Sequence, residues 1–356
     1  FVPTFAYMNN EDIKSAVTKL KSSNVNYLFK EDFLTNSDLL YSLLHLYRVW
    51  FIKTPPQIVL GIDFSPFVRE ELLSDLGFDS ALEGLLNFRF AKRLKQSKFK
   101  IPLVIDWWEG QPLDKGWSFG FKTFFPESIL KGYIGYPLLE MDLQLYPTDC
   151  EVENNVCHDI LSVIGEKFCE QISDMNLSLN VEIAPAFRFD HVWKNVEIKV
   201  EDSKSFKILL ALSINLDESV NILEQIIDTG LAEKYGFEFM IKTHPVINIS
   251  TLRNRLGNEK WPNSFIAVEG SFSDCIRISN LLIWGGISSV GLEAIALGIP
   301  VIIIETLSGI AFDPIPDTVP NELWKKCRSP SELFTAINAY RNRPSQEICL
   351  YKKLTT

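Results

Sequence analysis

The sequence lacks a hydrophobic run long enough to cross a membrane, and it lacks an excess of positive charge. Its longest apolar stretch, residues 294–304, is interrupted by Gly298 and Pro300 and falls short of the ~18 apolar residues that a spanning helix needs. Lys and Arg total 35 against 45 for Asp and Glu, so the net charge is −10. A domain-wide basic surface for nucleic acid is therefore excluded, whereas a local cationic pocket for one anionic ligand is not.

Cysteine is scarce, and its six residues are scattered along the chain. They form no CxxC pair and no Cys/His cluster, so we predict no zinc site or other metal site. A chain of this size does not need disulfides, and we expect free thiols in a reducing cytosol. The chain begins at Phe1 rather than Met and has no charged leader, so we expect it to be a trimmed piece of a longer protein.

Hydrophobic residues make up 46% of the chain and charged residues 22%, which is typical of a folded globular protein of about two domains. In the second half, helical patterns alternate with apolar runs at 206–212, 237–242, 264–268, 281–284 and 300–304. This alternation predicts βαβ units and a parallel sheet whose strands are buried on both faces. The first half predicts strands at 57–62, 101–105, 160–164 and 181–184, and helices over 37–53 and 81–95.

The polar stretch 190–205 separates the two halves and predicts a linker between two α/β domains. Two such domains are expected to hold a ligand between them, at the carboxyl ends of the strands.

The segment from Leu281 to Ile304 (LLIWGGISSVGLEAIALGIPVIII) carries the strongest pattern for ligand binding. Gly286 ends a buried strand and lets the backbone turn tightly beside a ligand. Ser288 and Ser289 stand where the next helix begins, so their hydroxyls and the free N–H groups predict a phosphate site. Glu293 follows within reach of a ribose hydroxyl. The alternative is a capped helix whose Glu293 faces solvent.

A second strand ends in Lys242 and continues into Thr243, His244 and Pro245. The proline stops the strand and helps to fix the histidine at its end. A lysine and a histidine there can neutralise the phosphate of a leaving nucleotide, and the histidine can protonate it near neutral pH. The alternative is a histidine that is merely hydrogen-bonded in a loop.

A third segment, VIDWWEGQP at residues 104–112, places carboxylates beside aromatic rings. Asp106 and Glu109 are predicted to lose contact with water, which raises a carboxyl pKa toward the range of a general base. Trp108 offers a ring that can stack on a donor or acceptor sugar, and Arg188 is placed to face the ligand cleft. The alternative is a capping aspartate with two packing tryptophans.

With these three segments, the sequence resembles a GT-B glycosyltransferase over about residues 101–304. Residues 206–304 resemble the nucleotide-sugar domain of that fold. The combination of Trp108-Glu109-Gly110, His244-Pro245 and Ser288-Ser289 is similar to bacterial transferases that use CMP-activated ulosonic acids, namely sialyl-, polysialyl- and Kdo-transferases. Residues 163–189 also resemble bacterial surface-carbohydrate biosynthesis proteins.

The resemblance implies two Rossmann-like domains, residues 1–190 and 191–356, that face each other across a cleft, with the last helix returning to the first domain. It implies metal-independent transfer of Kdo or a nonulosonic acid from CMP onto an oligosaccharide or lipid-linked acceptor of bacterial capsule or lipopolysaccharide. No resident cofactor is implied. The location implied is the cytoplasm or the cytoplasmic face of the inner membrane.

The resemblance also implies roles for individual residues. His244 would contact the CMP phosphate and assist its departure, Ser288 and Ser289 would hold that phosphate, and Glu109 would be the acid-motif carboxylate. The family pattern has two acids before the glycine, whereas here Trp108 takes the place of the first, and Asp106 then shares the role. Whether transfer inverts or retains the anomeric configuration stays open.

Other interpretations stay open as well. The donor of a GT-B transferase could be a UDP-sugar or CDP-glycerol. A sugar-nucleotide 2-epimerase shares the two-domain fold but needs no acceptor. A third interpretation is a non-catalytic nucleotide-binding module within a larger capsule-assembly protein.

Overall fold

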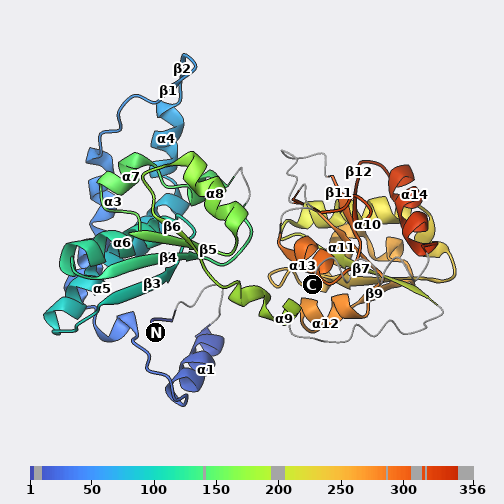
Figure 1. Cartoon of the computed structure of the whole chain (residues 1–356), viewed down its shortest axis with the longest axis horizontal. Helices are drawn as coiled ribbons and strands as arrows, with labels where there is room; N and C mark the ends of the chain where they lie inside the picture. The colour runs from blue at the N-terminus through green and yellow to red at the C-terminus, as the bar shows by residue number, and fades with distance from the viewer. Residues whose placement is uncertain are drawn as a thin grey trace. The chain divides into compact units, whose positions relative to one another are not determined.

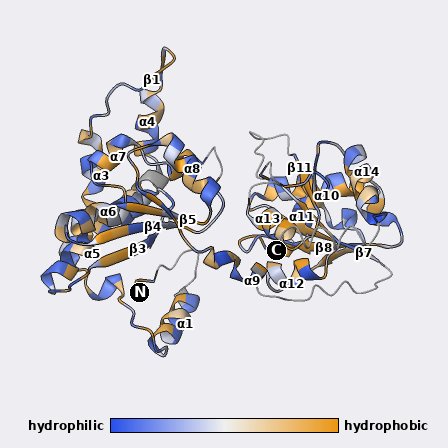
Figure 2. Cartoon of the chain, in the orientation of Figure 1, coloured by the Kyte–Doolittle hydropathy of each residue, from blue (hydrophilic) through white to orange (hydrophobic). Residues whose placement is uncertain are grey.

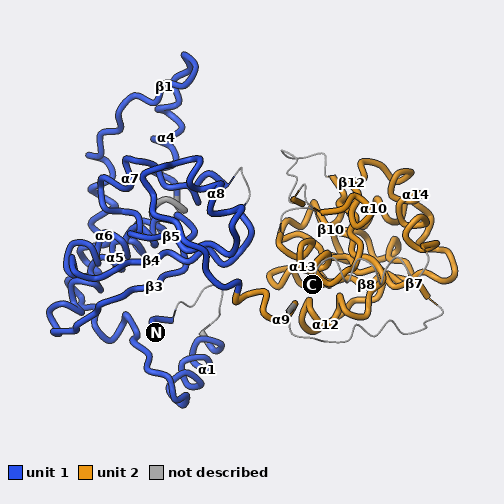
Figure 3. The backbone as a smooth tube through the Cα atoms, viewed as in Figure 1, with its two compact units in different colours: residues 1–186 blue, residues 187–356 orange. Residues whose placement is uncertain are grey.

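A computed structural model describes residues 1–3, 10–138, 142–193, 205–285, 288–305, 315–316 and 319–343. The chain divides into two compact units, residues 1–186 and 187–356. Each unit is built around its own parallel sheet (Figure 1). The division into units is drawn in Figure 3. The second unit begins with a 310 helix, η4 (Phe187–Phe189), and the short helix α9 (Asp190–Trp193). Residues 194–204, which follow α9, are outside the described part of the chain.

The second unit contains a six-stranded, wholly parallel sheet in the order β12-β11-β10-β7-β8-β9. Its strands are β7 (Phe206–Ala211), β8 (Phe237–Lys242), β9 (Phe265–Ala267), β10 (Leu281–Trp284), β11 (Val301–Ile304) and β12 (Trp324–Cys327). The strand order reverses between β7 and β10. In open parallel sheets, such a reversal marks the place where ligands bind, outside the carboxyl ends of the strands.

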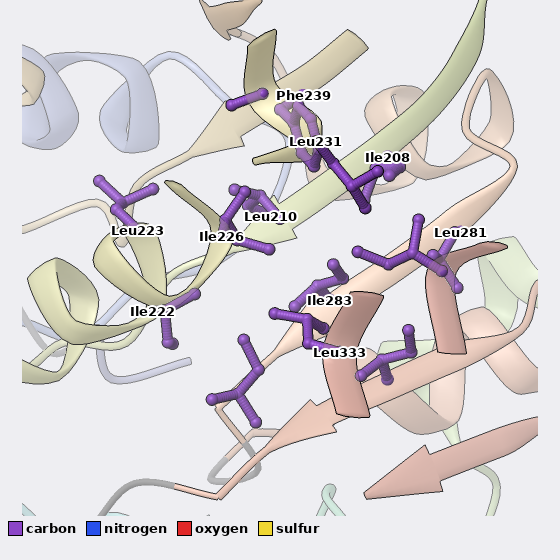
Figure 4. Close-up of a cluster of buried hydrophobic side chains, with 14 of the residues drawn as sticks. Ile208, Leu210, Ile222, Leu223, Ile226, Leu231, Phe239, Leu281, Ile283 and Leu333 are labelled. Atoms are coloured by element: carbon purple, nitrogen blue, oxygen red, sulfur yellow. The ribbon is translucent and has the colours of Figure 1, made fainter. Parts of the chain in front are cut away.

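Helices cover both faces of this sheet, as the apolar strands predict. They are α10 (Leu216–Asp228), α11 (Ile249–Leu256), α12 (Phe272–Arg277), α13 (Val290–Ala296) and α14 (Pro330–Arg341). Ile208 and Leu210 of β7 pack with α10, α11 and α14 on one face (Figure 4). Leu209 and Ala211 alternate to the other face, where they pack with α12 and α13. The central strands β7, β8, β10 and β11 are therefore buried on both sides, as predicted, whereas the edge strand β9 is partly exposed, with Ile266 43% exposed.

The first unit contains a four-stranded parallel sheet in the order β3-β4-β5-β6. Its strands are β3 (Leu103–Trp107), β4 (Ile129–Ile134), β5 (Ile160–Val163) and β6 (Val181–Ile183). Its helices are α1 (Asn10–Lys21), α2 (Asn36–Leu43), α3 (His45–Arg48), α4 (Ser65–Leu72), α5 (Asp75–Gln96), α6 (Pro112–Phe124), α7 (Asp149–Glu153) and α8 (Glu166–Met175).

Close backbone approach between α5 and α6 determines how the first unit packs. A Cβ added at Gly116 would lie 2.0 Å from the backbone oxygen of Gly84, and one at Gly84 would lie 2.5 Å from that of Pro112. Phe90 and Leu94 of α5 then pack with Phe121 of α6 in one core cluster. The two glycines therefore hold the beginning of α6 against α5.

Two sequence predictions in the first unit are wrong. Residues 57–62 do not form a buried strand; they form an exposed hairpin of β1 (Ile58–Val59) and β2 (Ile62–Asp63). Leu60 and Gly61 both have positive φ angles, of 52° and 80°, which is the geometry of a two-residue hairpin turn. The helix predicted over 37–53 is also broken, into α2, α3 and the 310 helix η2 (Val49–Phe51).

Candidate functional site

The carboxyl end of β8 presents the predicted lysine and histidine together. Lys242 is the last residue of β8, and its Nζ donates a 2.6 Å hydrogen bond to the backbone oxygen of Gly270. His244 lies half-buried in the following loop, where its Nδ1 faces the backbone N–H of Val246 at 3.4 Å. Because Nδ1 is the acceptor, the neutral ring carries its proton on Nε2. His244 can therefore offer an N–H to a ligand.

The predicted serines follow β10, on the other side of β7. Parallel strands are spaced by about 4.8 Å, so the ends of β8 and β10 lie roughly 10 Å apart, flanking the end of β7. Ser288 Oγ accepts a 3.1 Å hydrogen bond from Trp284 Nε1. Ser289 is the N-cap residue of α13, although its hydroxyl makes no capping bond. Gly286 lies outside the described residues.

Glu293 is buried, and its carboxylate is in contact with His191 and Ser289 of the same unit. Its Oε2 lies 3.0 Å from His191 Nε2, and its Oε1 accepts a 3.3 Å hydrogen bond from Ser289. Arg277 also donates to the backbone oxygen of His191 at 2.9 Å, so α9 is held against α12 and α13. The alternative of a solvent-facing Glu293 is wrong, and a ribose contact stays a prediction that requires one of these bonds to open. Arg188 is exposed on η4.

The first unit contains a cavity of about 1110 Å³ at the carboxyl end of β3, bounded by α1, α5 and the beginning of α6. Both predicted carboxylates, Asp106 and Glu109, line it. The other ionisable side chains in its lining are Lys21, Lys30, Glu31, Asp32, Asp79, Glu83 and Asp114. Carboxyl groups thus outnumber lysines, which disfavours an anionic ligand. Within the described part of the chain, no group of three His, Cys, Asp or Glu residues is arranged to hold a metal ion.

Asp106 is the carboxyl group of the cavity with the largest raised pKa. Burial, reinforced by the nearby charge of Asp114, raises the pKa of Asp106 to about 7. Its Oδ2 is buried with no hydrogen-bond partner among the described residues, 3.8 Å from Nε2 of His158. Burial lowers the pKa of His158 to about 3, so this ring is neutral, and its Nδ1 lies 3.2 Å from Ser118 Oγ. A carboxyl that exchanges a proton near neutral pH is suited to general acid–base chemistry.

Glu109 is held by hydrogen bonds from both sides. Its Oε1 accepts a 2.8 Å bond from Trp107 Nε1, and its Oε2 accepts a 2.8 Å bond from Gln111 Nε2. The Asp114 carboxylate accepts 3.0 Å bonds from the backbone N–H groups of Glu109 and Gln111, and burial raises its pKa to about 6. These bonds fix the loop between β3 and α6, and Glu109 with it.

Gly110 is required in this loop by its conformation and by a close neighbour. Its φ angle is +68°, and an added Cβ would lie 1.8 Å from the backbone oxygen of Gln144. A side chain at this position would therefore displace the loop that carries Glu109.

The structure corrects the assignment of Trp108 as a sugar-stacking ring. Trp108 is 1% exposed and lies in the core, with its ring packed edge-on against His158 at 5.0 Å. In a strand, successive side chains point to opposite faces, so Trp107 is the tryptophan that reaches the surface. Trp107 is 41% exposed and lines the cavity, so it is the ring available to a ligand.

Sequence reasoning missed several residues of this cavity. Lys30 comes from a segment more than seventy residues before β3, and it binds Glu83 and, at 2.9 Å, Asn87 of α5. No local pattern links these positions. Asp114 could have been found, because an acid three residues after the N-cap residue, here Gln111, is typical of a capping box.

Comparison with known proteins adds information on the fold. No protein-family model matches the sequence, and no curated protein matches it in sequence. A UDP-GlcNAc 2-epimerase from Neisseria meningitidis, bound to UDP-GlcNAc, matches with a TM-score of 0.53 at 15% identity, covering 97% of this chain and 90% of that one. The N-terminal domain of trehalose-6-phosphate phosphatase from Candida albicans matches with a TM-score of 0.52 at 12% identity, covering 97% and 82%.

A third match is an α,α-trehalose-phosphate synthase (UDP-forming) from Burkholderia vietnamiensis. Its TM-score is 0.51 at 12% identity, covering 80% of this chain and 74% of that chain. At these identities the likeness concerns the fold. The chain has an α/β fold with two parallel sheets that resembles GT-B glycosyltransferases and UDP-GlcNAc 2-epimerases.

Proposed function

We propose that this protein is a glycosyltransferase that moves a sugar from a nucleotide donor to a saccharide acceptor. The observation that carries the proposal is the pairing of Lys242 and His244 at the carboxyl end of β8, next to the reversal of strand order in a doubly wound sheet. This is the edge at which sheets of this kind bind nucleotides. The GT-B-like fold supports the same assignment.

The donor that we propose is a CMP-activated ulosonic acid, Kdo or a nonulosonic acid, used in capsule or lipopolysaccharide synthesis. A CMP-sugar presents one phosphate with a single negative charge. The ammonium of Lys242 balances that charge, and the Nε2–H group of His244 can donate a hydrogen bond to the charge that develops as CMP leaves. Ser288 and Ser289 would bind the phosphate oxygens with their hydroxyls.

The cavity of the first unit supports the acceptor half of the reaction. Its excess of carboxyl groups disfavours a phosphate, whereas carboxylates and the exposed ring of Trp107 suit the hydroxyls and faces of a sugar. We assign the cavity to the acceptor. Asp106 would remove the proton from the attacking hydroxyl, and Glu109 would position that hydroxyl.

The chemical step then balances as an inverting displacement. The acceptor oxygen forms a bond to the anomeric carbon of the donor while its proton passes to Asp106. The bond from that carbon to the CMP phosphate breaks, and the Nε2–H group of His244 donates a hydrogen bond to the departing phosphate as its negative charge increases. Asp106 fits the base role better than Glu109, because its pKa of about 7 is close to working pH.

A thermal-shift panel of CMP, CDP, UMP, UDP and GDP tests the donor assignment. We expect CMP to stabilise the chain more than the other nucleotides do. At a concentration ~100-fold above its Kd, a bound ligand adds about 2.7 kcal/mol to the free energy of unfolding. The shift should shrink in a Lys242→Ala variant and persist in Leu177→Ala, an exposed residue of the other unit. A larger shift with UDP would replace the CMP donor by a UDP-sugar, and no shift with any nucleotide would contradict the proposed function.

A further inference from the structure

The first unit carries a projecting apolar surface that its own core does not use. Six large side chains from η2, the hairpin and α4 define it, and we call them the hairpin patch: Trp50, Phe51, Ile58, Leu60, Ile62 and Phe67. All six are more than half exposed; Leu60 is 98% exposed and Phe51 is 82% exposed. Isolated exposed apolar residues are ordinary, whereas a contiguous group marks a binding surface.

The shape of the patch is convex. In the described part of the chain β1 and β2 pair only with each other, and the turn at Leu60 and Gly61 forms the tip of a ribbon that projects beyond α4 (Figure 1). The ribbon is apolar along most of its length (Figure 2). A narrow apolar projection can bury its surface in a fluid medium, because the molecules of the medium can surround it on all sides. A flat partner surface would leave most of the ribbon uncovered.

Cations and an amphipathic ring border the patch. The guanidinium of Arg69 lies 5.9 Å from the centre of the Trp50 ring and donates to the backbone oxygens of Val49 and Ile52 at 3.2 and 3.3 Å. Lys53 follows Ile52 in the sequence, and it is exposed. Tryptophan beside arginine or lysine is the pattern found where proteins meet the headgroup region of a membrane.

The charge of this segment differs from that of the chain. Residues 39–69 hold three cations, Arg48, Lys53 and Arg69, and one anion, Asp63. Glu70 and Glu71 come next, at the end of α4 that is remote from the hairpin, and bring the segment to neutrality. The whole chain has a net charge of −10. An anionic surface is therefore repelled by most of the molecule but not by the hairpin patch.

We propose that the hairpin patch docks the protein on an anionic lipid bilayer, with the side chains of the hairpin inserted among the headgroups. Among the described residues, no helix has the length and apolar character to cross a membrane, so the attachment is to one surface. Insertion of apolar side chains together with basic residues at the headgroups is sufficient for reversible binding. This inference does not depend on the identity of the donor or acceptor.

Co-sedimentation with vesicles of phosphatidylcholine and phosphatidylglycerol in equal parts tests the proposal. We expect the full chain to pellet with these vesicles, and several-fold less with vesicles of phosphatidylcholine alone. Leu60→Glu should weaken binding by about 10-fold or more, because it replaces an inserted apolar side chain by a charge. Phe51→Glu, at a separate point of the hairpin patch, should have the same effect.

Leu177→Glu is the matched control, because Leu177 is 90% exposed in the same unit but is not part of the hairpin patch; it lies between α8 and β6. It should bind vesicles like the unmodified chain, and circular dichroism should show all variants folded. Failure of the unmodified chain to pellet would overturn the proposal, as would equal losses in Leu60→Glu and Leu177→Glu. A lipid-free dimer that Leu60→Glu dissociates, without vesicle binding, would make the patch an interface between copies.

Discussion

Replacement of Asp106 by asparagine should reduce turnover by ~10²–10⁴-fold and leave CMP affinity unchanged. The loss is expected because Asp106 has a pKa of about 7 and lines the cavity of the first unit, whereas the nucleotide is assigned to the second unit. Glu109→Gln should have a smaller effect, since the amide keeps the bond from Trp107 to Oε1. Steady-state kinetics and CMP titration of both variants measure this. An inactive Glu109→Gln with an active Asp106→Asn would give the base role to Glu109.

The same substitution should change how stability depends on pH. The folded state raises the pKa of Asp106 to about 7, from about 3.9 in the unfolded chain, so folding favours the protonated form. The protonated form contributes its full amount to the free energy of unfolding below pH ~4, and this contribution is lost as pH rises through 7. By pH 9 the buried charge should cost up to about 4 kcal/mol.

Asn does not titrate, so the stability of Asp106→Asn relative to the unmodified chain should rise between pH 4 and pH 9. Urea unfolding at a series of pH values measures the difference in free energy. Asp217→Asn, at an exposed position whose carboxylate pairs with Arg255, should follow the unmodified chain throughout. A pH-independent difference for Asp106→Asn would mean that its carboxyl is ionised at neutral pH.

Replacement of His244 by alanine should lower kcat by ~10²–10³-fold while weakening CMP binding by much less. The reason is that the hydrogen bond from Nε2–H to the phosphate becomes stronger as the phosphate departs and its charge increases, whereas Lys242 and the serines remain to bind the ground state. Val246→Ala in the same loop is the control, because it truncates an exposed side chain without removing the backbone N–H that faces Nδ1. Equal losses in kcat and in affinity would make His244 a phosphate ligand only.

The sequence was most informative where each segment encodes its own structure. The apolar strands β7, β8 and β10, and the polar residues that follow β8 and β10, could be placed because a strand buried on both faces has a continuous apolar pattern. The same rule failed at residues 57–62, where Leu60 and Gly61 adopt positive φ angles and turn the apolar run into an exposed hairpin. An apolar run alone does not distinguish these outcomes.

The cavity of the first unit could be predicted only in part. Asp106 and Glu109 belong to one local motif, so they were found together. Lys30, Asn87 and His158 reach this region only through tertiary packing, which no local pattern records. Trp108 was misassigned because the sequence does not reveal which face of β3 the helices cover.

The central claim is that a sugar passes from a nucleotide to an acceptor, and product analysis tests it most directly. The chain would be incubated with CMP-Kdo or a CMP-nonulosonic acid, with and without a saccharide acceptor, and the nucleotide and saccharide products separated by chromatography. The account predicts release of CMP that depends on acceptor, with the acceptor longer by one sugar. Conversion of UDP-GlcNAc to its 2-epimer without any acceptor, and no release of CMP, would contradict it.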